Sequence, residues 1–246
     1  MKKVHVILRK EDISEEKLRE GSKVAVVLDI LLATTTITSA LSEGAAEVIP
    51  VLDVAEGINA AAGLEPETFV LAGETHGKPI DGFVYPIPSR LREMVKGKTL
   101  ILSTTNGTVA LRKSACASKV YISSLLNNRA VSESIKGESE TVIVVCSGNS
   151  GELSLEDFYG AGHFIDCLTA YDQWDMTDSA KAALHFYRSA SGSAFDILSS
   201  SRVGRLFARY GLAEDLEFAS QTDMKAIVPI LKNGRAVIHQ TALKGE

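Results

Sequence analysis

The chain has 246 residues, of which 45% are hydrophobic and 23% charged, and its formal net charge is −5. This balance is typical of a packed globular protein, and an acidic chain lacks the basic patch that nucleic-acid binding requires. No apolar run is long enough for a membrane-spanning helix, and the charged start is too short for a signal peptide. The three cysteines show no CxxC spacing, which predicts reduced thiols in a soluble cytoplasmic protein.

Short apolar runs alternate with helical segments along the chain. The predicted strands are 3–8, 24–29, 48–52, 69–71, 99–102, 120–122 and 141–146. The predicted helices are 34–43 and 54–62, with a charged helix or loop at 11–20 and a mostly helical part from about 154 to 220. Residues 73–90 contain several prolines and glycines and predict an irregular loop. Two runs around Asn233-Gly234, 228–231 and 235–238, predict a terminal hairpin.

This alternation predicts an α/β fold, with a largely parallel or mixed sheet between layers of helices. No low-complexity linker divides the chain, so we expect one catalytic unit over residues 1–246. The alternative is two interleaved subdomains, in which the helix-rich part covers about 154–220.

Three predicted strand ends share one pattern, in which hydroxyl or amide side chains precede a helix. The segments are 29–36, 103–108 and 146–151. The first turn of a helix has unpaired N–H groups, and its dipole favours negative charge, so such junctions suit anions. Three of them in one chain predict a shared phosphate or carboxylate site. The candidate substrate ligands are Thr34, Thr35, Thr36, Ser103, Thr104, Thr105, Asn106, Gly107, Ser147 and Gly148.

Common signatures of phosphate chemistry are absent from these segments. A phosphatase of the haloacid dehalogenase type needs a second Asp two residues after Asp29, where Leu31 stands. A cysteine phosphatase needs Arg six residues after Cys146, where Glu152 stands. The chain also has no GxxxxGK[ST] loop. Any phosphate chemistry would therefore use a different arrangement.

Four acidic residues lie close to the three turns. Asp29 ends a buried strand and is either a helix cap or a metal ligand. Glu74 begins the proline-rich loop and is a base, a ligand or a solvated charge. Ser154 with Asp157 fits a capping box in which the carboxylate reaches back to the helix start, and Glu156 remains free to face the site. The candidate anion clamps are Arg129, Arg202 and Arg205.

The order and spacing of these segments resemble one family, the 2-phosphosulfolactate phosphatases (the ComB family). The matching segments are Asp29 with 33–36, 72–74, 103–108 with 110–111, 124–131, 146–148, Gly151, 154–157 with 161–162, and Gly204, Leu206, Gly211, Asp215 and 228–229. The likeness covers nearly the whole chain. The chain departs from the family pattern at Leu32, Thr75 and Val109, where the family carries Arg.

The resemblance implies a layered αβα fold and a magnesium-dependent hydrolase that acts on 2-phospho-3-sulfolactate in coenzyme M biosynthesis. Under this hypothesis we expect Asp29 and Asp157 to bind Mg²⁺ and the catalytic carboxylates to be Asp29, Glu74, Glu156 and Asp157. Glu74, Glu156 or Asp157 would complete the metal shell or position water. The expected partner is a small anionic phosphorylated metabolite, and neither nucleic acid nor a membrane is expected to bind. The protein itself is expected to be a monomer or a homodimer. The missing arginines leave two alternatives: an inactive anion-binding homologue, or a hydrolase of a less charged ester.

Overall fold

The computed structural model describes residues 2–136 and 141–239. Within these ranges the strands form one eleven-stranded sheet in the order β5-β4-β6-β3-β11-β10-β7-β2-β8-β1-β9. The strands with parallel neighbours are β1 (Lys3–Ile7), β2 (Lys23–Leu28), β3 (Glu47–Val51), β4 (Phe69–Thr75), β6 (Thr99–Ser103), β7 (Lys119–Ser123), β8 (Thr141–Cys146) and β9 (Asp175–Met176). The strands with only antiparallel neighbours are β5 (Lys78–Pro79), β10 (Pro229–Lys232) and β11 (Arg235–Ile238).

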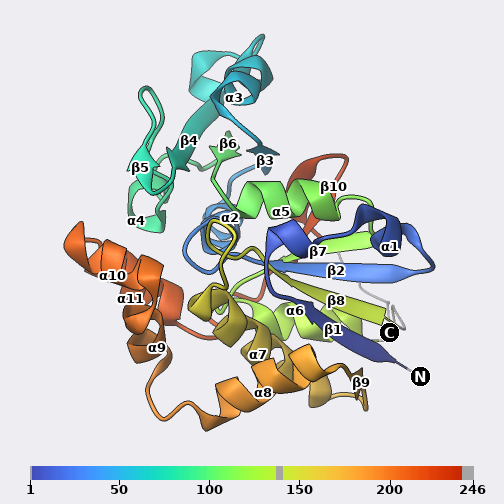
Figure 1. Cartoon of the computed structure of the whole chain (residues 1–246). Helices are drawn as coiled ribbons and strands as arrows, with labels where there is room; N and C mark the ends of the chain where they lie inside the picture. The colour runs from blue at the N-terminus through green and yellow to red at the C-terminus, as the bar shows by residue number, and fades with distance from the viewer. Residues whose placement is uncertain (1, 137–140, 240–246) are drawn as a thin grey trace, which may run out of the picture.

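Helices cover both faces of this sheet (Figure 1). The first six are α1 (Glu15–Arg19), α2 (Ala33–Ser42), α3 (Val54–Ala61), α4 (Pro88–Leu91), α5 (Gly107–Ser114) and α6 (Asn128–Ile135). The helix-rich part predicted at 154–220 contains α7 (Leu155–Thr169), α8 (Asp178–Ser189), α9 (Ala194–Ser200), α10 (Arg202–Arg209) and α11 (Ala213–Ser220). Two single 3₁₀ turns lie at Lys10–Asp12 and Pro66–Thr68.

The side chains of the central strand β2 alternate between two hydrophobic cores. Val26 and Leu28 belong to the core that contains Phe164 of α7, whereas Val27 belongs to the core that contains Ile37 of α2. A strand that is buried on both faces reads as a continuous apolar run, which is the pattern seen in the sequence. The predicted αβα fold with a largely parallel sheet is therefore confirmed.

The predicted C-terminal hairpin forms, but it lies in the middle of the sheet rather than at its edge. Ile230 of β10 pairs with Tyr121 of β7, and Ala236 of β11 pairs with Val48 of β3. The hairpin thus joins two parallel groups, β4-β6-β3 and β7-β2-β8-β1-β9. The proposed division into one unit or two subdomains stays a prediction.

Among the residues that the structure describes, no helix is long and apolar enough to cross a membrane. The loop predicted at 73–90 is largely irregular, although β4 runs into it as far as Thr75 and the short β5 and α4 lie within it.

Helix α5 contacts β2 of one parallel group and β3 of the other. This crossing brings the end of β6 next to the end of β2, where the candidate site lies.

Candidate functional site

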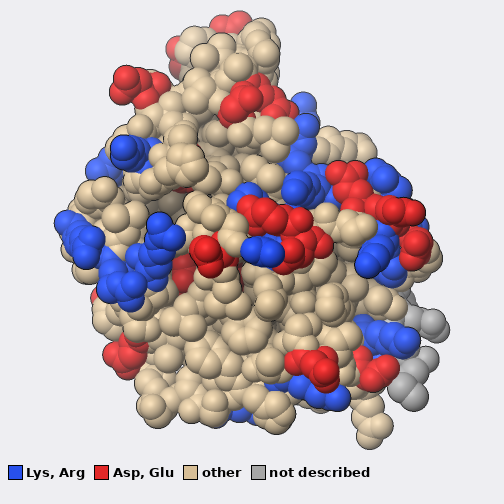
Figure 2. All heavy atoms as spheres, viewed as in Figure 1, with Lys and Arg blue, Asp and Glu red and all other residues tan. Residues whose placement is uncertain are grey.

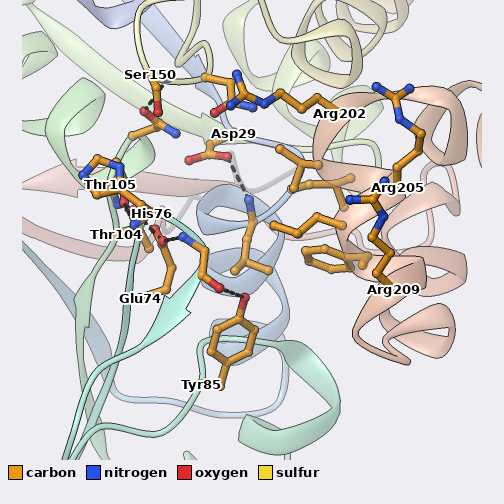
Figure 3. Close-up of a pocket in the computed structure, with 18 residues that line it drawn as sticks. Asp29, Glu74, His76, Tyr85, Thr104, Thr105, Ser150, Arg202, Arg205 and Arg209 are labelled. Carbon is orange, nitrogen blue, oxygen red and sulfur yellow. Dashed lines mark hydrogen bonds between the residues drawn. The ribbon is translucent and has the colours of Figure 1, made fainter.

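A pocket of about 440 Å³ opens at the carboxyl ends of β2, β4 and β6 and is bordered by the turn after β8 and by α10. Crevices at the carboxyl ends of parallel strands are the usual ligand sites of α/β sheets. Asp29 and Glu74 lie on one side of the pocket, and helix α10, which carries Arg202 and Arg209, lies on the other, with the Arg202 side chain extending toward Asp29 (Figure 3). Leucine, valine and phenylalanine side chains form part of the lining between them.

Asp29 directly follows β2, and its carboxylate is buried against the start of α5. The Leu32 N–H donates to Asp29 Oδ1 at 2.8 Å, and the Gly107 N–H donates to the same carboxylate. The pKa of Asp29 is raised to about 7, mainly by burial; the negative charges of Glu74 and Glu156 add to the rise, and the two backbone hydrogen bonds oppose it. Asp29 therefore lies in an environment of excess negative charge that a cation would relieve.

Glu74 is at the end of β4 and is tied to the turn after β6. The Thr105 N–H donates to Glu74 Oε1 at 2.7 Å, and the Gly77 N–H donates to Oε2 at 2.6 Å. The Thr105 hydroxyl donates to Oε2 at 3.1 Å. Glu74 therefore holds the irregular loop against the turn while its carboxylate lines the pocket.

Asp157 and Glu156 lie at the start of α7, and neither lines the pocket. Asp157 Oδ1 accepts from the Ile30 N–H at 2.8 Å, and Oδ2 accepts from the Gly148 N–H at 3.1 Å. Ser154 caps α7 as predicted, since Asp157 N donates to its hydroxyl at 3.1 Å. The prediction that the Asp157 carboxylate reaches back to the backbone of Ser154 is wrong, because this carboxylate binds the turns after β2 and β8 instead.

Burial is the main cause that raises the pKa of Glu156 and of Asp157. For Asp157, the neighbouring charges of Asp29 and Glu156 add to this effect. The Glu156 carboxylate also interacts with the hydroxyls of Ser201 and Ser154. It therefore connects the start of α7 to the start of α10, and its predicted catalytic role stays a prediction.

The backbone donors of the strand-end turns are occupied by carboxylates of the protein itself. The turn after β6 binds Glu74 through Thr105 and Asp29 through Gly107. The turn after β8 binds Asp157 through Gly148. These turns do bind anions, as expected, but the anions are carboxylate side chains of the protein, which the turns orient.

The threonines of the first turn are buried, and their hydroxyls donate to main-chain carbonyls. Thr34 bonds to Asp29 O, Thr35 to Ile30 O, and Thr36 to Pro86 O. None of the three threonines lines the pocket. Their contact with phosphate stays a prediction that this geometry does not support.

The other predicted ligands divide between the pocket and the core. Thr104, Thr105 and Asn106 line the pocket, and Asn106 Oδ1 accepts from Lys10 Nζ at 2.7 Å. Ser103 and Ser147 are buried outside it. The Ser147 hydroxyl has no hydrogen-bond partner among the residues that the structure describes.

Several lining residues were not among the predicted site residues: His76, Gly77, Tyr85, Asn149, Ser150 and Arg209. The candidate clamps Arg202 and Arg205 do line the pocket, whereas Arg129 is remote from it and pairs with Asp223 at 3.1 Å. Arg209 could have been found from the sequence, because Arg202, Arg205 and Arg209 are spaced i, i+3 and i+7, and residues at this spacing share one face of a helix. His76 and Tyr85 carry no such signal, since their loop is irregular.

A second cluster of potential metal ligands lies outside this pocket, at His163, Cys167 and Asp223. Asn128 Nδ2 lies 3.1 Å from His163 Nδ1, and His163 Nε2 lies 3.5 Å from Asp223 Oδ2. Arg129 already neutralises Asp223. The arrangement is that of a hydrogen-bonded cluster that ties α6 and α7 to the segment at Asp223.

Known proteins resemble this chain over most of its length. The family model described as 2-phosphosulpholactate phosphatase matches residues 7–234. The chain belongs to this family. A probable 2-phosphosulfolactate phosphatase of Clostridium perfringens (strain SM101 / Type A) is 37% identical over 98% of both chains. A protein of the same description from Caldanaerobacter subterraneus subsp. tengcongensis is 38% identical over 90% of this chain and 92% of its own.

The three positions where this chain lacks the family's Arg differ in their surroundings. Leu32 lines the pocket, Thr75 is exposed, and Val109 is half-buried on α5. Of these three positions, Leu32 is the one that lines the pocket, so the charge of the residue there bears directly on a bound ligand. The arginines that line the pocket here all belong to α10.

Gly107 allows α5 to approach Asp29, and we predict that Gly107→Ala disables the site. A Cβ at this position would overlap Asp29 Oδ2 and lie 2.9 Å from Asp29 Cβ. Because a displacement of about 1 Å can cost roughly 100-fold in rate, we expect phosphatase kcat/KM to fall by about that factor. Gly192→Ala, at an exposed glycine outside the pocket, is the matched control: its added Cβ would lie 3.0 Å from Asp196 Cβ and far from Asp29, so the rate should stay unchanged. Equal rates for both variants would contradict this role of Gly107.

Proposed function

We propose that this chain is a magnesium-dependent phosphatase that hydrolyses 2-phospho-3-sulfolactate to 3-sulfolactate and phosphate. The observation that carries the proposal is a pocket with buried carboxylates on one side and arginines on the other. Such a pocket suits a polyanionic substrate that meets a divalent cation at one end. The family and the names of the two relatives support the same substrate.

The carboxylates of this site fit a magnesium ion. Asp29 and Glu74 line the pocket, and neither forms an ion pair with Lys, Arg or His in the described part of the chain. Mg²⁺ prefers one or two carboxylates and completes its shell with water and phosphate oxygens. Asp29 and Glu74 would hold the ion, and Asp157 would stabilise the turn behind Asp29. When bound, the ion would neutralise the carboxylates and polarise a phosphoryl oxygen.

The residues of the chain itself would bind and orient the ester. The arginines of α10 would attract the anionic substrate, and the backbone donors that hold Glu74 and Asp29 fix both carboxylates before the substrate binds. Leu31, Leu32 and Phe207 supply apolar surface in the lining. Apolar surroundings lower the local dielectric and strengthen these electrostatic contacts.

The proposal is tested by phosphate release from 2-phospho-3-sulfolactate with Mg²⁺ and with a chelator, beside a panel of simpler phosphate monoesters. We expect turnover of the sulfonated ester that stops on chelation and returns when Mg²⁺ is added back. Turnover of only simpler esters would reject the substrate but keep the phosphatase. No release from any ester would reject the enzymatic proposal and favour an anion-binding protein.

A further inference from the structure

Helix α10 presents a cationic face to the pocket. Arg202, Arg205 and Arg209 all line the pocket. Among the described residues none of the three forms an ion pair with a carboxylate, although most other arginines do so. In the view of Figure 2, basic side chains gather over α10 beside the hollow.

This charge arrangement is unfavourable for the isolated helix. Positions 202, 205 and 209 follow the i, i+3 and i+7 pattern, and like charges at such spacing destabilise a helix. Arg202 is the first residue of α10, where the positive end of the helix dipole repels a cation. An anion bound in the pocket would relieve both effects.

The protein holds α10 firmly in this place. Ser201 caps the helix by accepting from the Gly204 N–H at 2.9 Å. A Cβ at Gly204 would lie 2.7 Å from the Leu198 carbonyl carbon, so α9 and α10 approach each other closely only because position 204 is glycine. Phe207 is buried in the core beneath the helix. The arginines therefore project from a fixed support.

The side chains on this face take different directions. In Figure 3, Arg202 extends from α10 toward the side of the pocket that carries Ser150 and Asp29. The guanidinium of Arg205 turns back along the helix and donates to Ser200 O. Arg202 and Arg209 are thus the cations left to meet a ligand in the pocket.

We propose that Arg202 and Arg209 form a subsite for the acid groups that the substrate keeps, namely its sulfonate or carboxylate, and not for the phosphate that is removed. The argument is one of position: Asp29 and Glu74, which suit a cation and through it the phosphate, lie across the pocket from Arg209 and from the backbone of Arg202, whose side chain spans the space between them. This inference rests on the proposed function, because it takes the phosphate to bind beside Asp29 and Glu74. It makes both arginines specificity-determining residues.

The test compares Arg202→Ala and Arg209→Ala with the unchanged enzyme on three esters: 2-phospho-3-sulfolactate, 2-phospholactate and isopropyl phosphate. A charge-assisted hydrogen bond is worth enough to change affinity by about 30-fold, so kcat/KM for the sulfonated ester should fall by about that factor in each variant, mainly through KM. For isopropyl phosphate, which has neither acid group, the change should stay below about threefold. A loss that persists with 2-phospholactate assigns the carboxylate to the arginines, and a loss confined to the sulfonated ester assigns the sulfonate.

Equal losses on all three esters would overturn the proposal, because the arginines would then act on the phosphate; no loss on any ester would also overturn it. Arg188→Ala, which removes an exposed arginine paired with Asp166 outside the pocket, is the matched control. Arg202→Lys and Arg209→Lys should recover part of the sulfonate preference, which a folding defect would not explain.

A binding measurement separates this inference from the proposed function. Calorimetric titration of 3-sulfolactate needs no turnover, and each alanine variant should bind it about 30-fold more weakly than the unchanged protein. If no ester is hydrolysed but this loss is seen, the proposed function fails and the subsite stands. If the unchanged protein does not bind 3-sulfolactate, the subsite is rejected.

Discussion

Asp29→Asn should lower phosphate release by about 1,000-fold with little loss of folded protein, because an ion held at this position contributes several kcal/mol to the transition state. The side chain lies at the end of β2 and lines the pocket. Asparagine keeps the Oδ1 acceptor for the Leu32 N–H, which lies 2.8 Å away in the structure. The measurement is steady-state phosphate release at saturating Mg²⁺, with a thermal melt to confirm the fold.

Asp53→Asn is a suitable control for this variant. Asp53 caps α3 by accepting from the Glu56 N–H at 2.8 Å, is exposed, and lies outside the pocket. Asparagine caps helices about as well as aspartate, so both stability and rate should stay the same. Full activity of Asp29→Asn would remove Asp29 from the metal site and from catalysis.

The protein stripped of metal should lose stability as pH rises from about 4 to about 7. The folded pKa of Asp29 is about 7 and its ordinary value is 3.8, so the folded state keeps a proton that the unfolded state has already released. The stabilisation is complete below the lower value and is lost as pH approaches the upper one. The loss is on the order of 4 kcal/mol for this group alone. The raised pKa values of Glu156 and Asp157 act in the same direction.

Denaturant melts in chelator at pH 5 and pH 8 measure this effect, and adding Mg²⁺ at pH 8 should restore most of the lost stability. The Asp29→Asn variant should show a smaller pH dependence, because its amide does not titrate. A chelated protein that is more stable at pH 8 than at pH 5 would contradict the description of the site as an excess of buried negative charge.

Much of the fold follows from local patterns in the sequence. The run from Val24 to Leu28 predicts a strand buried on both faces, and the Asn233-Gly234 turn predicts a hairpin, since each depends on neighbouring residues. The position of the hairpin between β3 and β7 does not follow from local patterns. It depends on pairings such as Ala236 with Val48, which lie far apart in the chain.

The site shows the same division between local and distant information. The turns that suit anions are visible in the sequence, but their ligands are not, because Asp157 meets Ile30 across a large stretch of chain. The surplus of hydroxyls at 34–36 predicted ligand contact, whereas the structure shows each hydroxyl bonded to a carbonyl. The cationic face of α10 is readable from its spacing, but its position over the pocket requires the packing of α9 and α10.

The central position of β10 and β11 has a consequence for the way in which this protein is made. A ribosome releases the chain from its N-terminus, so the strands on both sides of the hairpin emerge before the hairpin that separates them. Until residues 229–238 leave the exit tunnel, β3 and β7 each expose an edge that the hairpin covers in the finished sheet. Unpaired edges of this kind are templates for association with other chains. A chain in which the hairpin has not yet paired is therefore expected to aggregate more readily than the finished sheet.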